Sequence, residues 1–583
     1  MWRNYLTVGF RALAKNKTYA FINIFGLALG LAACLMILLY VRYELSYDSW
    51  IPASARSYQV QAVNTDLETG AVTREQMTAF PVGLALAKDF PQIEAASRAI
   101  PSSEIELQGG EANEVPVLMV DTPFFSILPL PFLHGDPVTA LDGMDAIVLT
   151  EQEAIKRFGR SDVVGQLITV SRSEGKAVLR VTGVLRDLPS NTHLDIGLVT
   201  RFNAVKFSDY VDQWGLIGGY NYVKLRPGAD LASIHAQLPA WEKRNIPAEN
   251  VGNVRRSPGD PRDWYLTSVA DVHLGEAQDS AMTPGNDPRT IVTFVIIAAL
   301  ILGMACVNFT NLATARASQR AREVALRKVL GATRSNLVFQ FMGESLLLAT
   351  ISMLFALALV ETALPLLSAF LEADLALDYF GAGGIVLPVL GLVLLVGGAG
   401  GLYPAVYLSR FQPARVLKAN RSGSDTDRSG QLRNLLVVAQ FAVSIGLIIC
   451  TLIVYLQTDH ARTTDAGYNR EGLLQVVGID RKKVSSLHDT LVQQMRTVEG
   501  VRSLTLTNTT IGTGGNTLAT DAQVPGRQEP VRIETYAIDP TFASTIGARL
   551  LAGRTLSEAH ALDEATFPEE DDRNSHAGWS RAA

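Results

Sequence analysis

The stretch Ala20–Val41, AFINIFGLALGLAACLMILLYV, contains no charged residue. About 20 mostly apolar residues in a helix are enough to cross the roughly 30 Å hydrocarbon core of a membrane. Similar apolar stretches follow at residues 291–314, 337–360, 383–408 and 435–456. The sequence therefore predicts a membrane α-helical protein with about five transmembrane helices.

Composition indicates that these helices are joined to substantial polar regions. The mean hydropathy of +0.17 is low for a bundle of membrane helices alone and high for a soluble protein. The formal net charge is −6, without the long single-sign run that would favour nucleic-acid binding. All three cysteines lie in apolar stretches, and the eight histidines lack the spacing of a zinc site. We expect no nucleic acid, metal or cofactor.

Charged residues in the loops predict one orientation. Basic residues precede the first apolar stretch and follow the second and fourth, whereas the connection between the third and fourth is acidic. Positive charge favours the cytoplasmic side of a membrane. We therefore expect a cytoplasmic N-terminus and an external position for residues 42–289. The basic residues are Arg3, Arg11, Lys15 and Lys17, then Arg316, Arg320, Arg322, Arg327, Lys328 and Arg334, then Arg410, Arg415, Lys418, Arg421, Arg428 and Arg433; the acidic ones are Glu372, Asp374 and Asp378.

Gly26 and Gly30 lie four residues apart in the first apolar stretch. This spacing is typical of close contacts between membrane helices. It also arises by chance in a helix rich in Ala and Gly, so both interpretations stay open.

The external region has the pattern of an α/β domain. Strands are predicted at residues 146–150, 165–170, 177–185 and 221–225. Thr150 is a suitable N-cap for a helix over Glu151 to Phe158 that ends at Gly159. A second helix is predicted from Leu231 to Trp241.

The chain also resembles itself at a separation near 420 residues. The segment Val120-Asp121-Thr122-Pro123-Phe124-Phe125 is matched by Ile538-Asp539-Pro540-Thr541-Phe542. Each segment is preceded by a spanning helix, which predicts a duplication with a second, partial external domain at 457–557. The acidic residues 558–583 lack periodicity, so we expect a disordered or aberrant tail and an incomplete second unit. A chain truncated in this way should be inactive unless a partner completes it.

The segment after the second apolar stretch carries the strongest functional signal. Residues 317–334 read ASQRAREVALRKVLGATR. A helical projection places Ala321, Val324, Ala325 and Val329 on one side, interrupted by Lys328, and Arg320, Glu323 and Arg327 on the other. Glu323 and Arg327 have i, i+4 spacing, and Gly331 is placed to cap the helix. Such a helix could lie flat at the membrane surface. Composition alone favours a basic loop that only fixes orientation.

This segment closely resembles the cytoplasmic loop of MacB/FtsX-like ABC transporter permeases. The matching positions are Arg322, Glu323, Val324, Leu326, Arg327, Lys328, Leu330, Gly331 and Ala332. The resemblance extends to Tyr19–Leu27, Tyr43–Asp48, Arg186–Leu194, the Phe339-Gln340-Phe341 and Glu344-Ser345 pair of motifs, and Gly401–Ala405, whose glycine and proline would bend or end the fourth helix. It implies that the segment docks on an ATPase, with Arg320 as a further member of the docking set.

The resemblance implies a domain plan for the whole chain. Residues 1–41 form the cytoplasmic N-terminus and first helix, 42–289 a MacB-like periplasmic core domain, and 290–412 an FtsX-like permease domain with three spanning helices. Residues 413–434 form a cytoplasmic linker, followed by the fifth helix at 435–456.

The same resemblance implies the permease subunit of a mechanotransmission ABC transporter in a bacterial inner membrane. Its partners would be the lipid bilayer, a cytoplasmic ABC ATPase subunit, and in some assemblies a second permease copy, a periplasmic adaptor or an outer-membrane channel. The expected role is efflux of small molecules or peptides, or a lipoprotein or envelope process. The alternative is an FtsX-like signalling subunit that activates an external partner without transport.

The sequence has no Gly-x-x-x-x-Gly-Lys-Ser/Thr phosphate loop, so we expect ATP to be bound by a separate subunit.

Two further classes of function, a membrane-anchored enzyme and a proton-coupled secondary transporter, are disfavoured. A membrane-anchored enzyme could use Asp187, His193 and Asp195 as acid–base groups, but no nucleophile motif accompanies them. Glu344 and Glu361 could line a proton path, although we expect Glu344 near the cytoplasmic start of its span, in reach of water or Arg334.

Overall fold

The computed structural model contains five helices that are long and apolar enough to cross a membrane, among the residues that it describes. The described residues are 17–52, 54–65, 70–108, 111–172, 175–205, 207–214, 216–246, 249–251, 254–256, 262–381, 384–409, 427–476, 487–507, 518–522, 531–557, 559–560 and 563. The five helices are α2 (Lys17–Glu44), α8 (Pro288–Val329), α9 (Arg334–Leu371), α10 (Val386–Ser409) and α12 (Asp427–Thr463).

Contacts divide the chain into two compact units. The membrane unit contains residues 1–55, 188–194 and 267–457, and the second unit contains residues 56–187, 195–266 and 458–583. The predicted domain plan placed 42–55, 188–194 and 267–289 in the periplasmic domain, whereas the structure groups these segments with the membrane helices. The predicted linker at 413–434 is also partly helical, because α12 begins at Asp427.

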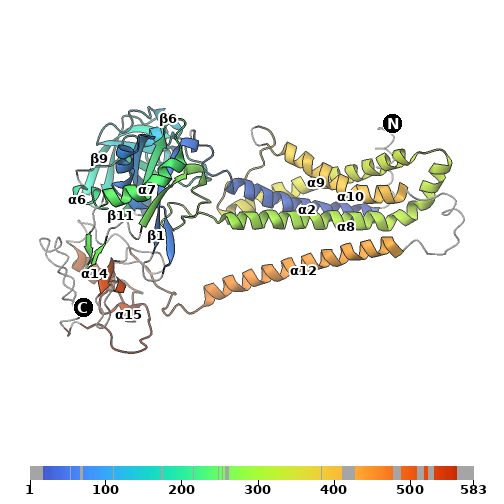
Figure 1. The fold of residues 1–583 in the computed structure, drawn as a ribbon. Helices are drawn as coiled ribbons and strands as arrows, with labels where there is room; N and C mark the ends of the chain where they lie inside the picture. Colours follow the sequence, from blue (N-terminus) through green and yellow to red (C-terminus); the bar gives the residue numbers. More distant parts are fainter. Residues whose placement is uncertain are drawn as a thin grey trace. The chain divides into compact units, whose positions relative to one another are not determined.

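Helices α2, α8, α9 and α10 lie side by side in one bundle (Figure 1). Their shared core includes Leu31 from α2, Phe309 from α8, Met353 from α9 and Val396 from α10. Pro404 does not end α10, which continues to Ser409. Helix α12 contacts α8 through a hydrogen bond from the Ser444 hydroxyl to the sulfur of Met304, at 3.3 Å.

Small residues bring the helices of this bundle close together. A Cβ atom added to Gly30 would lie 2.7 Å from the Cβ of Ala305 on α8. A Cβ added to Gly400 on α10 would lie 2.2 Å from the ring of Phe309. A side chain at either position would collide with its neighbour, so Gly30 makes the close helix contact that its spacing left open. Gly26 is less constrained, since its added Cβ would lie 3.6 Å from Asn308.

The second unit is built around a mixed β-sheet with the strand order β14-β1-β11-β4-β5-β10-β7-β9-β6. Strands β10 and β5 are parallel, as are β7 and β9, whereas β1–β11, β11–β4, β4–β5, β10–β7 and β9–β6 are antiparallel. The strands of this path are β1 (Ser57–Thr65), β4 (Ile93–Gln108), β5 (Glu111–Val120), β6 (Phe132–Gly135), β7 (Ala146–Thr150), β9 (Gly175–Leu185), β10 (Leu198–Arg201), β11 (Ile217–Leu225) and β14 (Arg262–Ser268).

Short elements complete this unit. Strands β2 (Val72–Glu75), β3 (Thr78–Ala79) and β8 (Leu167–Arg172) pair with β1, β11 and β9, and β12 (Glu249–Val251) pairs with β13 (Val254–Arg256). The helices are α3 (Val82–Asp89), α4 (Phe124–Ile127), α5 (Glu151–Phe158), α6 (Ser208–Val211) and α7 (Leu231–Asn245), with 3-10 turns at Ser54–Arg56 and Val269–Asp271.

Several clusters of buried hydrophobic residues fill the described part of this domain. One includes Ile234, Trp241 and Trp264, and another includes Ile147 and Val181. The predicted strand at 146–150 and helix at 151–158 match β7 and α5, and α7 is four residues longer than expected. The α/β domain is therefore confirmed as a fold.

The C-terminal part contains α14 (His488–Arg496), the hairpin β15 (Leu518–Ala522) and β16 (Val531–Thr535), and α15 (Phe542–Thr545). It shares one local structure with the first copy of the predicted repeat. The Asp121 carboxylate accepts the Arg98 N–H at 2.9 Å, and the Asp121 N–H donates to the Arg98 carbonyl at 3.4 Å. Asp539 makes the same two bonds with Leu506, at 3.0 and 3.2 Å. Most of the predicted tail at 558–583 lies outside the described residues.

Candidate functional site

The segment predicted to dock on an ATPase forms the end of α8 and the turn into α9. Val324 and Ala325 are 1% and 0% exposed. Val324 packs with Leu337 and Phe341 of α9 and with Ala405 of α10. Burial of apolar surface between three helices therefore holds the end of α8 in place.

The turn itself has the hydrogen bonds of a Schellman motif. The Gly331 N–H donates to the Lys328 carbonyl at 3.1 Å, and the Ala332 N–H donates to the Arg327 carbonyl at 3.0 Å. Gly331 has φ of 95°, which glycine adopts at little cost. The Thr333 hydroxyl then caps α9 by accepting the Asn336 N–H at 3.3 Å. The predicted capping role of Gly331 is confirmed.

A chain of polar side chains joins α8 to α9 beside this turn. Arg327 Nη1 donates to Gln340 Oε1 at 2.8 Å, and Gln340 Nε2 donates to Glu344 Oε1 at 3.2 Å. Gln340 is only 8% exposed. A charged donor strengthens such a bond, and burial makes its loss costly. Arg327 therefore holds the turn against α9 through Gln340. Glu344 lies ten residues after Arg334, the first residue of α9, and its predicted place near the cytoplasmic start of the span stays a prediction.

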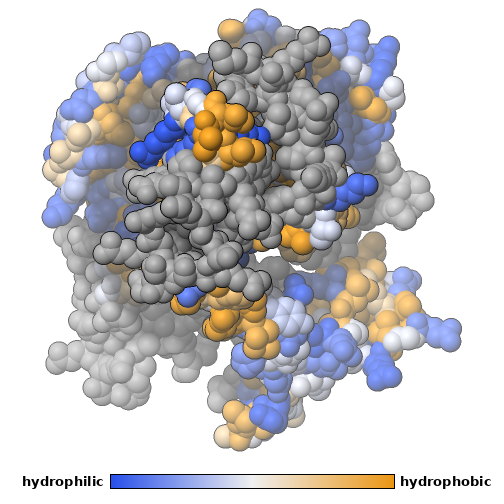
Figure 2. All heavy atoms as spheres, turned by 90° about the vertical axis from the view of Figure 1, so that its right-hand side faces the viewer, coloured by the Kyte–Doolittle hydropathy of each residue, from blue (hydrophilic) through white to orange (hydrophobic). Residues whose placement is uncertain are grey.

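The outer surface of the turn is apolar. We define the turn surface as Leu326, Val329 and Leu330, whose exposed fractions are 58%, 63% and 78%. Figure 2 looks onto the molecule from the side of this turn and shows small hydrophobic patches next to a few hydrophilic side chains. The sequence placed Val329 on the same side as Val324 and Ala325. It is exposed instead, because α8 ends there and no helix in the described part of the chain covers it.

Basic charge surrounds the turn surface. Between residues 316 and 334 the sequence has Arg316, Arg320, Arg322, Arg327, Lys328 and Arg334, against one acid, Glu323. The backbone of Arg320, Arg322 and Glu323 is helical, and their side chains lie outside what the structure describes, as does the predicted Glu323–Arg327 pair. An exposed apolar patch with a polar border is typical of a protein–protein contact.

Helix α8 is continuous through this segment. Its apolar part ends at Thr314, and its last 15 residues, 315–329, extend without a break. At about 1.5 Å per residue this extension is about 22 Å long. Helix α8 therefore continues into the segment without a break in its helical backbone, and its end curves before the turn into α9 (Figure 1). The position of this extension at the membrane surface stays a prediction.

The acid–base groups considered for an enzyme have other partners. His193 Nδ1 lies 2.8 Å from Asp48 Oδ2, and both side chains are buried. Asp187 accepts the Gln152 N–H at 2.9 Å at the start of α5. Burial raises the pKa of Asp195. The three groups thus have separate structural surroundings.

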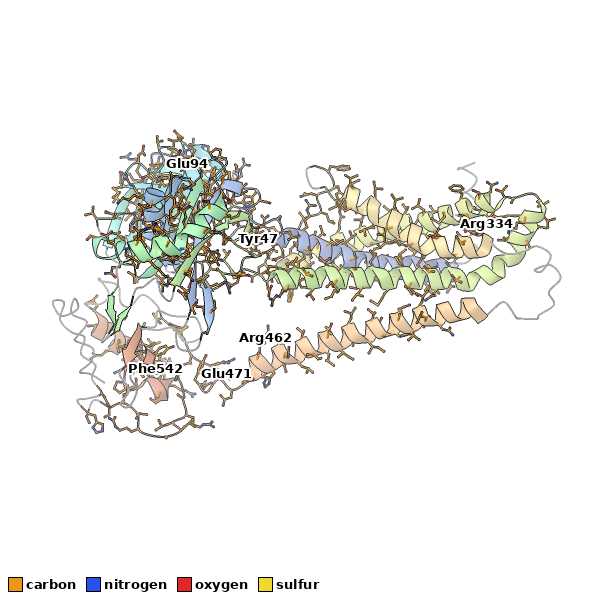
Figure 3. The ribbon with its side chains drawn as sticks, in the orientation of Figure 1. Tyr47, Glu94, Arg334, Arg462, Glu471 and Phe542 are labelled. Carbon is orange, nitrogen blue, oxygen red and sulfur yellow. The ribbon has the colours of Figure 1, made fainter. Side chains whose placement is uncertain are left out.

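Sequence reasoning missed the partners of His193. Tyr43–Asp48 directly follows the first apolar helix, whereas Arg186–Leu194 lies between β9 and β10, so the sequence does not indicate that the two motifs meet. Tyr47 lies close to the end of α2, and Arg334 lies at the opposite end of the bundle (Figure 3). Burial raises the pKa of Tyr47.

Comparison with known proteins places both parts of the chain in one family. Residues 20–241 match the MacB-like periplasmic core domain, and residues 295–413 match the FtsX-like permease C-terminal domain. The macrolide export ATP-binding/permease protein MacB of Bdellovibrio bacteriovorus is 22% identical over 436 residues, which are 71% of this chain and 61% of that protein. The protein of the same name from Agrobacterium fabrum is 20% identical over 60% of this chain and 50% of its own length.

The chain thus spans about half to three-fifths of the length of these relatives. Among solved structures, the periplasmic region of MacB from Actinobacillus actinomycetemcomitans has 14% sequence identity and a TM-score of 0.26, covering 36% of this chain and 89% of that one.

The two matched regions correspond to the α/β domain and to the helices after it, and the apolar helices fit a bacterial inner-membrane protein with a periplasmic α/β domain. The chain belongs to the MacB/FtsX-like family of ABC transporter permeases.

Proposed function

We propose that this chain is the subunit through which a separate cytoplasmic ATPase moves the periplasmic domain. The main support is the turn surface, which is apolar, exposed and fixed at the end of a helix that spans the bundle. A subunit docked there can push or rotate the end of α8. The movement is transmitted over the length of the membrane helix without a substrate channel through the bundle.

The residues of the docking segment have different roles in this proposal. Leu326, Val329 and Leu330 make the apolar contact, and Lys328 with Arg320 and Arg322 attracts acidic groups of the partner. Arg327 holds the turn on α9 through Gln340. Val324, Gly331 and Ala332 set the position and direction of the turn.

Charge placement supports a cytoplasmic position for this turn. Positive residues concentrate at 316–334 and the acidic residues Glu372, Asp374 and Asp378 follow α9 at its other end. In a membrane this asymmetry favours the basic side as cytoplasmic. The α/β domain, entered from the other end of α2, then lies in the periplasm.

The relatives support export as the purpose of this movement, since two are named macrolide export proteins that combine ATP-binding and permease functions. We propose efflux of small molecules or peptides, with ATP bound by a separate subunit. A second permease copy and a periplasmic adaptor would complete the assembly.

The test is copurification of the ATPase with variants of the turn surface. Val329→Glu combined with Leu330→Glu places two carboxylates on exposed positions, so the fold should be kept while docking is lost. The matched control is Val138→Glu with Val205→Glu, two exposed positions of the α/β domain, at 77% and 84% exposure.

Each protein is purified from native membranes, and the nucleotide-binding subunit is identified by photolabelling with azido-ATP. We expect the labelled subunit with wild type and the control pair, and its loss with the turn pair. Equal recovery with the turn pair would overturn the docking assignment.

A further inference from the structure

A buried polar cluster lies at the end of the bundle where α2 ends and α8 begins. It joins three segments of the membrane unit: residues 40–50, the loop 188–194, and residues 273–287. We call this cluster the outer junction. It contains two motifs of the sequence, Tyr43–Asp48 and Asn191–His193, that the docking proposal does not use.

Asp48 is the centre of the first half of the junction. Its carboxylate is fully buried and accepts bonds from the Thr192 hydroxyl at 2.6 Å, the His193 N–H at 3.1 Å and His193 Nδ1 at 2.8 Å. A buried carboxylate is costly unless it is satisfied in this way. Asp48 also has φ of 53°, a conformation that non-glycine residues adopt only when their surroundings hold them there.

Further hydrogen bonds attach the whole loop 188–194 to the turns after α2. They are Asp48 N–H to the Asn191 carbonyl at 3.1 Å, Asn191 Nδ2 to the Ser46 hydroxyl at 2.9 Å, Trp50 Nε1 to the Asn191 carbonyl at 3.3 Å, and the Tyr43 hydroxyl to Ser190 Oγ at 3.1 Å. The loop is therefore fixed at four successive residues, Ser190 to His193.

Glu44 is the centre of the second half. Its Oε2 lies 2.8 Å from His273 Nε2 and accepts the Asn286 amide at 3.1 Å. An ionised carboxylate can only accept, so His273 donates through Nε2. The Tyr47 ring stacks on the imidazole at 3.3 Å between centroids. These contacts join the last turn of α2 to the segment that leads into α8.

The order of the chain gives these contacts a mechanical consequence. Residues 45–56 lead from α2 into β1, and residues 269–287 lead from β14 into α8. The loop 188–194 connects β9, which ends at Leu185, to β10, which begins at Leu198. In the sheet, β14 and β1 are neighbours at one edge, whereas β10 and β9 flank β7 in the other half. One cluster thus holds chain segments that continue into both halves of the sheet.

Stability alone does not explain this arrangement. A buried polar or charged pair is often no more stabilising than apolar residues of the same volume, and in some proteins such pairs serve to fix one arrangement. His273 Nδ1 is buried without a hydrogen-bond partner among the described residues, which costs stability. No group of His, Cys, Asp and Glu that could hold a metal occurs in the described part of the chain.

We propose that the outer junction passes the movement of α2 and α8 to both halves of the periplasmic sheet, with Asp48, His193, Glu44 and His273 as its positioning residues. The directional carboxylate–histidine pairs keep the loop 188–194 and residues 273–287 in register with the end of α2. The role in transmission rests on the proposed function, whereas the attachment of the loop does not.

The first experiment measures transmission in the full complex. A spin label at Val205→Cys, an exposed position of the α/β domain, reports the nucleotide-dependent change between ADP- and vanadate-trapped states. Glu44→Gln and Asp48→Asn keep side-chain shape and remove the carboxylate. We expect both variants to bind the ATPase and hydrolyse ATP as wild type does, but to lose most of the label's change.

His235→Gln is the matched control, because His235 is a histidine of the α/β domain whose Nε2 accepts the Leu266 N–H outside the junction. It should keep the full change. Tyr43→Phe removes one hydroxyl and should give a partial loss, which separates transmission from misfolding. A full change in Glu44→Gln and Asp48→Asn would overturn the proposal.

Amide hydrogen exchange of the purified chain tests the junction without the ATPase. Asp48→Asn should raise exchange in residues 188–194 by about tenfold or more and leave residues 231–245 unchanged. Unchanged exchange in 188–194 would refute the attachment. If exchange rises but wild type shows no nucleotide-dependent change, the proposed function fails and the attachment stands.

Discussion

Glu242 gives the α/β domain a specific dependence on pH. It lies on α7, is 2% exposed, and accepts the Trp264 N–H at 3.0 Å. Burial raises its pKa from 4.5 to about 7. The hydrogen bond from Trp264 lowers the pKa and the nearby charge of Asp263 raises it, and both effects are smaller than that of burial. The substitution is Glu242→Gln, which keeps the accepting oxygen and cannot ionise.

The sign follows from proton binding. Below pH 4.5 both the folded and the unfolded chain carry the proton, and between 4.5 and 7 only the folded chain keeps it. The free energy of unfolding therefore falls as pH rises through this window. Each factor of ten in proton affinity is worth about 1.4 kcal/mol, so this group removes about 3 kcal/mol of stability by pH 8.

The assay is urea unfolding of the full-length protein in detergent, followed by fluorescence of the clustered Trp214, Trp241 and Trp264. The difference in unfolding free energy between Glu242→Gln and wild type should rise by about 3 kcal/mol from pH 4.5 to pH 8. Glu94→Gln, an exposed carboxylate paired with Arg56, is the control and should shift by no more than about 0.5 kcal/mol. A constant difference for Glu242→Gln would refute the reasoning.

Two further predictions concern packing and a buried ion pair. Gly30→Leu should lower the melting temperature of the full chain by several degrees, because its Cβ would lie 2.7 Å from the Cβ of Ala305 on α8. The control Gly303→Leu should not lower it, since a Cβ at Gly303 would have no neighbouring atom within 4 Å. Equal melting temperatures of the two variants by circular dichroism would contradict the close contact. Asp121→Ala removes the carboxylate that lies 2.8 Å from the Arg98 guanidinium, a side chain that is 7% exposed. The free energy of unfolding, measured in urea, should fall by about 3 kcal/mol. A fall below about 1 kcal/mol would show that Arg98 finds another partner.

Local signals predicted the elements that the structure confirms. Thr150 accepts the Glu153 N–H at 3.4 Å and Gly159 has φ of 72°, so the sequence bounds of α5 were correct. The five long apolar helices were predicted because membrane thickness sets the length of an apolar run that can cross it. The Schellman turn at Gly331 was predictable for the same reason as α5, since its hydrogen bonds join neighbours in sequence.

Contacts between distant residues could not be predicted in this way. Asp48 and His193 are 145 positions apart, and Glu44 and His273 are 229 apart, so only the folded chain brings them together. Val329 was misplaced because a helical projection does not show where neighbouring helices end. The repeat at 457–557 stays a prediction, supported by the matching bonds of Asp121 and Asp539.

The most direct test of the account is the side of the membrane on which the α8–α9 turn lies. Leu330→Cys is introduced into a chain whose Cys34, Cys306 and Cys450 are replaced, and spheroplasts are treated with a membrane-impermeant maleimide. The exposed Leu330→Cys should be labelled only after permeabilisation, whereas Val205→Cys should be labelled in intact spheroplasts. Labelling of Leu330→Cys in intact spheroplasts would contradict cytoplasmic coupling to an ATPase.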